Sequence, residues 1–104
     1  MDKIPASIEM TIRKFIEEAG QSHRIKSAYL YGSYAKGVAS KWSDIDIAVI
    51  LTDYSDDLFE ERVSLMRIAA QIDDRIEPYP FLEETFAANN PLANEIQKHG
   101  IRIV

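Results

Sequence analysis

The sequence contains no cysteine, only four glycines and four prolines, and no long hydrophobic run. Without cysteine there can be no disulfide, thiolate metal site or cysteine nucleophile, which agrees with a reducing compartment. The longest aliphatic run, Ile47 to Leu51, is far too short to span a bilayer. The segment from Met1 to Pro5 lacks the apolar core of a signal peptide. We therefore expect a soluble, cytoplasmic protein with no membrane partner.

Basic residues are also scarce, with twelve against seventeen acidic ones, so the formal net charge is −5. A protein that binds a phosphate backbone needs the opposite sign, and a nucleic-acid partner is therefore disfavoured. Part of the acidic excess is clustered, as expected for the N-terminus of a helix, whose dipole favours carboxylates. The cluster consists of Asp53, Asp56, Asp57, Glu60 and Glu61.

The chain has the size of one domain, with 104 residues of which 46% are hydrophobic. No repeat, low-complexity tract or linker interrupts it, so we expect residues 1–104 to form a single domain. Predicted helices and strands alternate along the sequence. This alternation indicates an α/β or α+β fold in which a small mixed β-sheet is flanked by helices. The order of the strands cannot be derived from the sequence.

Hydrophobic periodicity and turn residues predict the individual elements. A first helix follows Pro5, which suits a first turn, and stops at Gly20; a strand spans Ile25 to Tyr31, and a Gly-containing turn with a short helix follows it. The next strand, Asp44 to Leu51, is apolar on both sides towards its end, which predicts a central position. A helix beginning at Asn90-Pro91 and closed by Gly100 precedes a last strand from Ile101 to Val104.

Between the central strand and the last helix, the pattern predicts a helix and an edge strand. The helix would serve as a crossover, with Asp57 and Glu60 forming a capping box. The strand, Arg75 to Tyr79, contains Pro78, and Pro80 follows it, so it should lie at an edge or end quickly. The apolar residues of the helix are Phe59, Val63, Met66 and Ala70, with Leu65, Ala69 and Ile72 beside them.

Two short motifs carry the candidate chemistry. In the first, Gly32-Ser33 joins a strand to a helix, where backbone N–H groups can cradle phosphate, although a small turn of this kind is also common in structural roles. In the second, period-two alternation directs Asp44 and Asp46 to one face, where two like charges favour a hard divalent cation. A capping Asp44 with a solvated Asp46 is the alternative for the pair alone. Their combination with Gly32-Ser33 favours the metal site.

The spacing of these motifs resembles a known family. Gly32-Ser33, ten intervening residues and Asp44-x-Asp46, with Ala35 and Gly37 completing a Gly-Ser-x-Ala-x-Gly form, are similar to the nucleotidyltransferase superfamily of DNA polymerase beta. By its size the chain resembles the minimal nucleotidyltransferases (MNT) encoded beside HEPN-domain proteins in prokaryotes. The resemblance extends to the C-terminal half through Ile76-Glu77-Pro78, Asn90-Pro91-Leu92, Glu95-Ile96 and Gly100-Ile101.

The resemblance implies a role for each motif. Gly32 and Ser33 would hold the terminal phosphates of an NTP, and Asp44 and Asp46 would bind two Mg²⁺ ions at the α-phosphate. The superfamily also uses a third carboxylate from a later strand, for which Glu77 is the best candidate, as metal ligand or general base. Asp73 and Asp74 are rivals, although acids at a helix-to-strand junction are more often structural.

One position departs from the family pattern. The residue after Ser33, often basic in relatives, is Tyr34, which leaves Lys36 and Lys41 as the candidate cations near the triphosphate, unless they are merely solvated. Trp42 could stack on a base, but a lone tryptophan beside a strand is more often a packing residue. The two histidines, His23 and His99, lie near predicted helix ends, where a charge–dipole contact is favoured over catalysis.

The function implied by the resemblance is Mg²⁺-dependent transfer of AMP from ATP to a hydroxyl of a HEPN-domain toxin, a tyrosine, with this chain as antitoxin. So short a chain has little left to enclose an acceptor, so another molecule should present it. One alternative is an inactive antitoxin that neutralises its partner by binding. Another is transfer to a small molecule, which would require an additional substrate domain. The base of the NTP, the number of AMP units, and the choice between oligomer and hetero-complex remain open.

Overall fold

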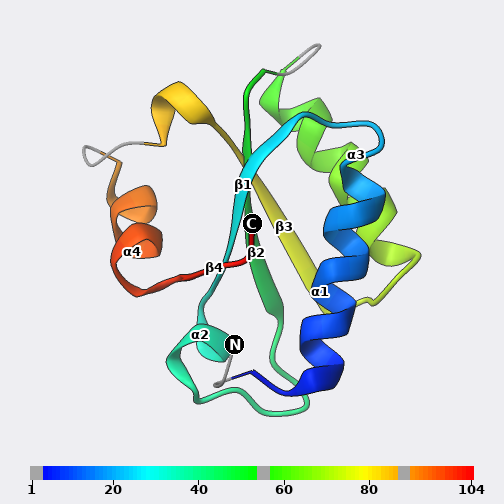
Figure 1. The fold of residues 1–104 in the computed structure, drawn as a ribbon, viewed down its shortest axis with the longest axis vertical. Helices are drawn as coiled ribbons and strands as arrows, with labels where there is room; N and C mark the ends of the chain where they lie inside the picture. The colour runs from blue at the N-terminus through cyan, green and yellow to red at the C-terminus, as the bar shows by residue number, and fades with distance from the viewer. Residues whose placement is uncertain (1–3, 54–56, 87–89) are drawn as a thin grey trace.

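The computed structural model describes residues 4–53, 57–86 and 90–104. Helices α1 and α3 lie over one face of a β-sheet, and α4 lies over the other (Figure 1). The predicted fold, a small mixed sheet flanked by helices, is confirmed. The elements are α1 (Ala6–Ala19), β1 (Ile25–Tyr31), α2 (Ser33–Lys36), β2 (Ile45–Leu51), α3 (Leu58–Ala70), β3 (Ile76–Leu82), a 3₁₀ helix η1 (Glu83–Thr85), α4 (Pro91–His99) and β4 (Ile101–Arg102).

The sheet has four strands in the order β3-β2-β1-β4. Strand β1 pairs antiparallel with β2 and β4, while β2 and β3 are parallel. Parallel neighbours need a crossover connection, and α3 supplies it as predicted. The predictions that the second strand is central and the third lies at an edge are also confirmed.

The boundaries of three elements differ from the prediction. Strand β2 begins at Ile45, so Asp44 lies immediately before it, and β4 ends at Arg102 because its pairing with β1 is confined to two residue pairs. Strand β3 continues through both prolines to Leu82. On an edge strand successive N–H groups alternate in direction, so prolines two residues apart can both face the open side without losing a ladder bond.

Helix termini carry the predicted caps, with two differences in detail. The Asp57 side chain accepts a hydrogen bond from the Glu60 amide at 2.8 Å, and Asn90 caps α4. Asp56, predicted to belong to the same acidic N-terminus, lies outside the described residues. Pro5 is the N-cap of α1 rather than a first-turn residue. No helix within the described ranges has the length and apolar character needed to cross a membrane.

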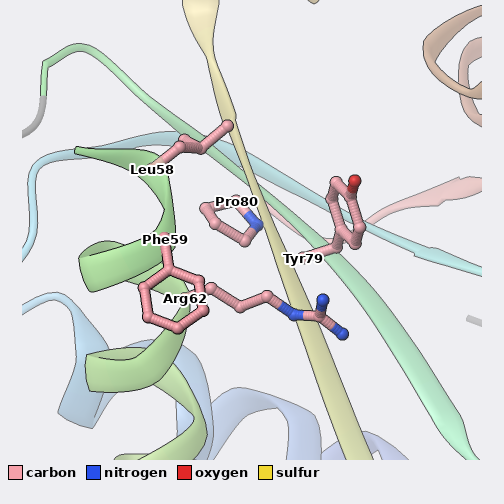
Figure 2. Close-up of a pocket in the computed structure, with 5 residues that line it drawn as sticks. All are labelled: Leu58, Phe59, Arg62, Tyr79 and Pro80. Carbon is pink, nitrogen blue, oxygen red and sulfur yellow. The ribbon is translucent and has the colours of Figure 1, made fainter.

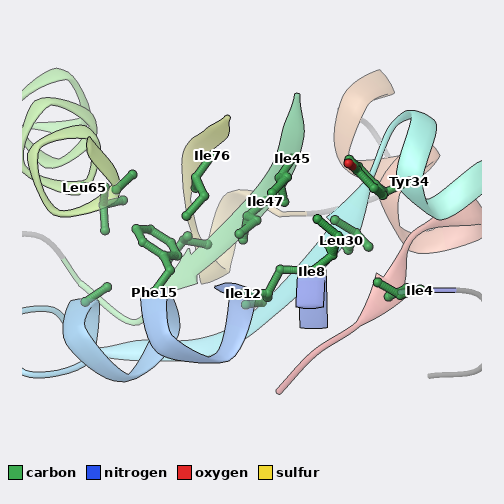
Figure 3. Packing of buried hydrophobic residues seen from close by; sticks show 14 of the residues in the cluster. Ile4, Ile8, Ile12, Phe15, Leu30, Tyr34, Ile45, Ile47, Leu65 and Ile76 are labelled. Carbon is green, nitrogen blue, oxygen red and sulfur yellow. The ribbon is translucent and has the colours of Figure 1, made fainter. Parts of the chain in front are cut away.

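The main core lies between the sheet and the pair of helices α1 and α3 (Figure 3). Phe15 and Ile12 of α1 are fully buried against strand residues such as Leu30 and Ile47. Truncating a buried phenylalanine to alanine typically costs about 3–5 kcal/mol, so Phe15 alone is a large part of the stability of a domain of this size. A smaller cluster on the opposite face joins α4 to the strands: Ala48, Ile50, Phe81, Ala93 and Ile96.

Helix α3 presents a different face to the sheet than its apolar pattern predicted. Leu65 and Ala69 are buried, but Phe59 is 71% exposed and Met66 is 44% exposed. The helix bears apolar residues on more than one stripe, and its packing against β3 and α1 buries the stripe that contains Leu65. Glu61, on that stripe, pairs with His23 after the end of α1 at an Oε2–Nε2 distance of 3.0 Å.

Candidate active site

Asp46 and Glu77, two of the three carboxylates predicted to bind metal, are neighbours on adjacent strands of the sheet. Asp46 is paired with Tyr31 of β1 on one side and with Glu77 of β3 on the other. Residues directly opposite one another in a sheet direct their side chains to the same face. Because Ile45 and Ile47 face the main core, this row of three points to the face that carries α4. The tertiary fold therefore brings together residues from three strands.

The electrostatics of the row centre on Asp46, which is half-buried. Burial raises the pKa of Asp46 above its ordinary value, and the charges of Asp44 and Glu77 raise it further. Asp44 itself is exposed at the entrance to β2. The two neighbouring carboxylates thus destabilise the charge of Asp46, as expected where an oxygen-binding cation belongs.

Gly32 makes the close approach of backbone and carboxylate possible. Its backbone has φ 73° and ψ −150°, a conformation that L side chains rarely adopt. A Cβ added at this residue would overlap Oδ2 of Asp46 and lie 3.2 Å from its Cγ. The turn predicted to bind phosphate is therefore packed directly against the predicted metal ligand.

Ser33 and Lys36, the other two residues predicted to bind phosphate, follow Gly32 directly in the short helix α2. Ser33 is half-buried at the start of α2, and its carbonyl accepts a hydrogen bond from the Val38 amide at 3.1 Å. Lys36 is exposed and lines a cavity of ≈ 100 Å³ together with Tyr31 and Gly32. The structure thus brings Lys36 to the same end of the sheet as the predicted phosphate turn.

The other candidate cation, Lys41, stands over the ring of Trp42, with Nζ 5.0 Å from the ring centroid. Trp42, to which the sequence assigned no role, is 81% exposed and is therefore not packed into the core. His23 fits its predicted helix-end contact, with Nδ1 3.1 Å from the carbonyl oxygen of Ala19 in the last turn of α1. His99 occupies the last turn of α4.

Asp73 and Asp74, the alternative candidates for the third carboxylate, are not paired with Asp46 in the sheet. Asp73 forms an ion pair with Arg75, with Oδ2 and Nη2 2.7 Å apart, and hydrogen bonding to Arg75 lowers the pKa of Asp73. Asp74 is exposed in the turn before β3. Neither takes part in the strand pairing that aligns Glu77 with Asp46.

Three residues in or beside the row formed by Tyr31, Asp46 and Glu77 were not predicted from the sequence to belong to the site. Tyr31 belongs to the row itself, and burial, followed by the charge of Asp46, raises its pKa to about 12. Tyr79, two residues after Glu77 on β3, lies on the same face of the sheet. Arg62 of α3 is close enough that its positive charge partly offsets the rise in the Tyr31 pKa. The alternation along the strands could have identified both tyrosines. Arg62 had no sequence signal, since it reaches the site from a helix on the opposite face.

The donor set suits magnesium bound together with a nucleotide. Within the described residues, no three His, Asp or Glu side chains converge in a form that could hold a metal alone. Mg²⁺ usually uses one or two carboxylates and completes its octahedron with water and substrate phosphates, rather than a cage made only of protein. Half-buried Asp46, flanked by Glu77 and Asp44, fits that mode. Such a site is suited to chemistry at a phosphate.

Residues 13–104 match the family described as polymerase beta, nucleotidyltransferase. The match covers most of the chain, which therefore belongs to the polymerase beta nucleotidyltransferase family. The resemblance inferred from Gly32-Ser33 and Asp44-x-Asp46 is confirmed, and the family is one of nucleotidyltransferases.

Three individual proteins that are similar to this chain bear on its function. A Methanocaldococcus jannaschii protein named as a protein adenylyltransferase is 38% identical over 47 residues, or 45% of this chain and 55% of that protein. The match thus spans about half the length of that curated relative. A toxin–antitoxin structure with AMP-PNP is similar with a TM-score of 0.68 and 25% identity, over 92% of this chain and 72% of the solved one.

A third relative comes from a complex between the tri-AMPylated HEPN toxin of Shewanella oneidensis and its MNT antitoxin. Its TM-score is 0.60 at 23% identity, and the likeness covers 92% of this chain and 68% of the solved chain. At that identity the comparison shows a shared fold.

Proposed function

We propose that this chain transfers AMP from ATP to a hydroxyl, that of a tyrosine, on a partner HEPN-domain protein, and so acts as its antitoxin. The observation that carries the proposal is the alignment of Asp46 with Glu77 across two strands, with the Gly32 turn packed against Asp46. Relatives whose structures contain AMP-PNP or an AMPylated HEPN toxin support the choice of nucleotide and acceptor. We propose that residues 1–104 constitute one minimal nucleotidyltransferase domain.

The phosphates would lie at the turn between β1 and α2. Gly32 permits a ligand to approach the backbone closely, and Ser33 and Lys36 would donate hydrogen bonds and positive charge to the terminal phosphates. The acidic chain would otherwise repel ATP. Lys36 is the nearest of the predicted cations to this turn, since it shares a cavity with Gly32.

Asp44, Asp46 and Glu77 would hold two Mg²⁺ ions, which when bound neutralise the phosphates and favour in-line displacement. In the proposed step, the acceptor oxygen forms a bond with the α-phosphorus while the bond from that phosphorus to the bridging oxygen of pyrophosphate breaks. Glu77 accepts the proton of the acceptor hydroxyl. Pyrophosphate leaves with the electrons of the broken bond.

The proposal is tested by incubating the protein with MgATP and its proposed HEPN-domain partner, followed by intact-mass spectrometry. We expect the partner to gain one or more AMP units. Asp46→Asn should still bind the partner but transfer nothing. Asp53→Asn is the matched control because Asp53 is an exposed acid beyond the opposite end of β2, and it should transfer at the wild-type rate.

Cellular protection separates enzymatic silencing from simple binding. If the wild type protects cells from the HEPN protein without a change in its mass, and Asp44 and Asp46 variants protect equally well, then occlusion is the mechanism. Labelling of a small-molecule hydroxyl in preference to the HEPN protein would instead indicate the third class of acceptor.

A further inference from the structure

An exposed groove lies where α3 passes the open edge of β3. It is lined by Leu58, Phe59 and Arg62 of α3 and by Tyr79 and Pro80 of β3, a set we call the edge groove (Figure 2). Its volume is ≈ 180 Å³. Pockets for small molecules usually enclose roughly 300–1,000 Å³, so the edge groove is suited to a side chain or two of another protein rather than to a nucleotide.

The composition of the edge groove is that of a protein-binding surface. Phe59 is 71% exposed and Tyr79 is 37% exposed, although both have large apolar surfaces. Aromatic residues and arginine are enriched at the centres of protein interfaces, where they contribute most of the binding energy. The packing of α3 on its Leu65 stripe leaves Phe59 outside the core of this domain.

The open edge of β3 does not favour pairing with another strand. A strand added at an edge needs N–H donors, and Pro78 and Pro80 have none. A partner at this edge would therefore be recognised through side chains, in particular through the exposed apolar surface of Phe59 and Leu58.

The edge groove is continuous with the carboxylate row. Tyr79 follows Glu77 by two residues on β3 and so projects from the same face. Figure 2 shows Arg62 extending from α3 across β3 towards Tyr79, and its guanidinium carbon is 5.2 Å from the centroid of the Tyr79 ring. A polypeptide whose hydroxyl reached Glu77 would bring its neighbouring residues over Tyr79 and Arg62.

Charge defines the partner further. Asp46 and Glu77 make the adjacent end of the face acidic, whereas Arg62 offers a positive charge at the edge groove. No ion pair joins Arg62 to another residue in the described part of the chain. Its guanidinium, held over an aromatic ring, retains its hydrogen-bond donors for a carboxylate.

We propose that the edge groove is the docking surface for the polypeptide that carries the acceptor hydroxyl, and that it binds an apolar side chain against Phe59 and Leu58 and a carboxylate at Arg62. This inference rests on the proposed function. It makes acceptor choice a property of α3 and β3, apart from the residues that would bind ATP.

The test uses Phe59→Asp and Arg62→Glu, with Met10→Asp as a matched control, since Met10 is 72% exposed on α1 outside the edge groove. Calorimetry measures binding to the proposed HEPN-domain partner, and mass spectrometry measures AMP transfer. We expect affinity for the HEPN protein to fall about tenfold or more in both groove variants, as for interface hot spots. Met10→Asp should bind within about twofold of the wild type, as expected for a surface site outside an interface. Phe59→Asp should retain its affinity for MgATP and its melting temperature, since an aspartate in the first turn of α3 suits the helix dipole.

Wild-type affinity and transfer in both groove variants would overturn the docking proposal. A change in the sedimentation of the isolated chain carrying Phe59→Asp, with HEPN binding unaltered, would overturn it in favour of self-association. Loss of HEPN binding in Phe59→Asp would support the docking surface even if the wild type adds no AMP mass, an outcome that refutes the proposed transfer alone. If the wild type does not bind the HEPN protein at all, both proposals fail.

Discussion

Replacing Gly32 by alanine tests whether this glycine positions Asp46. Residue 32 has φ 73° and ψ −150°, and an L residue in this region is strained by roughly 1–3 kcal/mol. For a domain of this size, each kcal/mol lowers the melting temperature by roughly 4–8 °C. The new Cβ would also overlap Oδ2 of Asp46, so the carboxylate must move away. Displacing a catalytic group by about 1 Å can cost on the order of 10²-fold in rate.

Gly37→Ala is the control that separates strain from displacement. Gly37 also has a positive φ of 75°, but a Cβ there would have no neighbour within 4 Å. Alanine in this left-handed conformation costs roughly 1–2 kcal/mol, so the two variants should lose comparable stability in thermal melts. Only Gly32→Ala should lose AMP transfer, measured at a temperature where both are folded. If Gly32→Ala transfers AMP as fast as Gly37→Ala, the argument that Gly32 makes room for Asp46 is refuted.

Three further predictions concern the carboxylates. Calorimetry should detect ATP binding only with Mg²⁺ or Mn²⁺, and the double variant Asp44→Asn, Asp46→Asn should lose most of it; undiminished binding in excess Mg²⁺ would contradict the metal assignment. Glu77→Gln should reduce transfer far more than ATP affinity, because a proton acceptor acts mainly in the transition state, whereas the opposite ranking with Asp74→Asn would place the third carboxylate at Asp74. The raised pKa of Asp46 means that its contribution to stability is fully present below the unfolded pKa, about 3.9 for Asp, and is lost as pH rises through the folded pKa. Without metal, Asp46→Asn should therefore be more stable than the wild type at pH 7 by denaturant unfolding, and the difference should shrink towards low pH; an equal or larger difference at low pH would contradict this.

Local patterns in the sequence were sufficient for much of the fold. Alternation along β2 placed Asp46 opposite the core-facing isoleucines, and Gly20, Asn90 and Gly100 marked helix ends because they act through the backbone of their own segment. The spaced Gly32-Ser33 and Asp44-x-Asp46 motifs were likewise sufficient for the family. Their individual roles in binding phosphate and metal, and that of Lys36, stay predictions.

Local patterns were not sufficient where a residue's surroundings come from distant parts of the chain. Helix α3 carries apolar residues on two stripes, and periodicity alone does not say which stripe packs against β3 and α1, so the exposure of Phe59 was not foreseen. Strand β3 continues through both of its prolines because it lies at the edge of the sheet and, among the described strands, pairs only with β2. This position depends on the order of the strands, which only the tertiary fold sets.

The sequence by itself determined the alternation of helices and strands and the family motif, including its two carboxylates Asp44 and Asp46, since each depends on residues close together in the chain. Only the tertiary structure decided that Glu77, rather than Asp73, stands beside Asp46, and that Arg62 reaches Tyr79 across the edge of the sheet. Both depend on the register between β2 and β3 and on the rotation of α3. These are set by the packing of the whole core and cannot be read from any one segment.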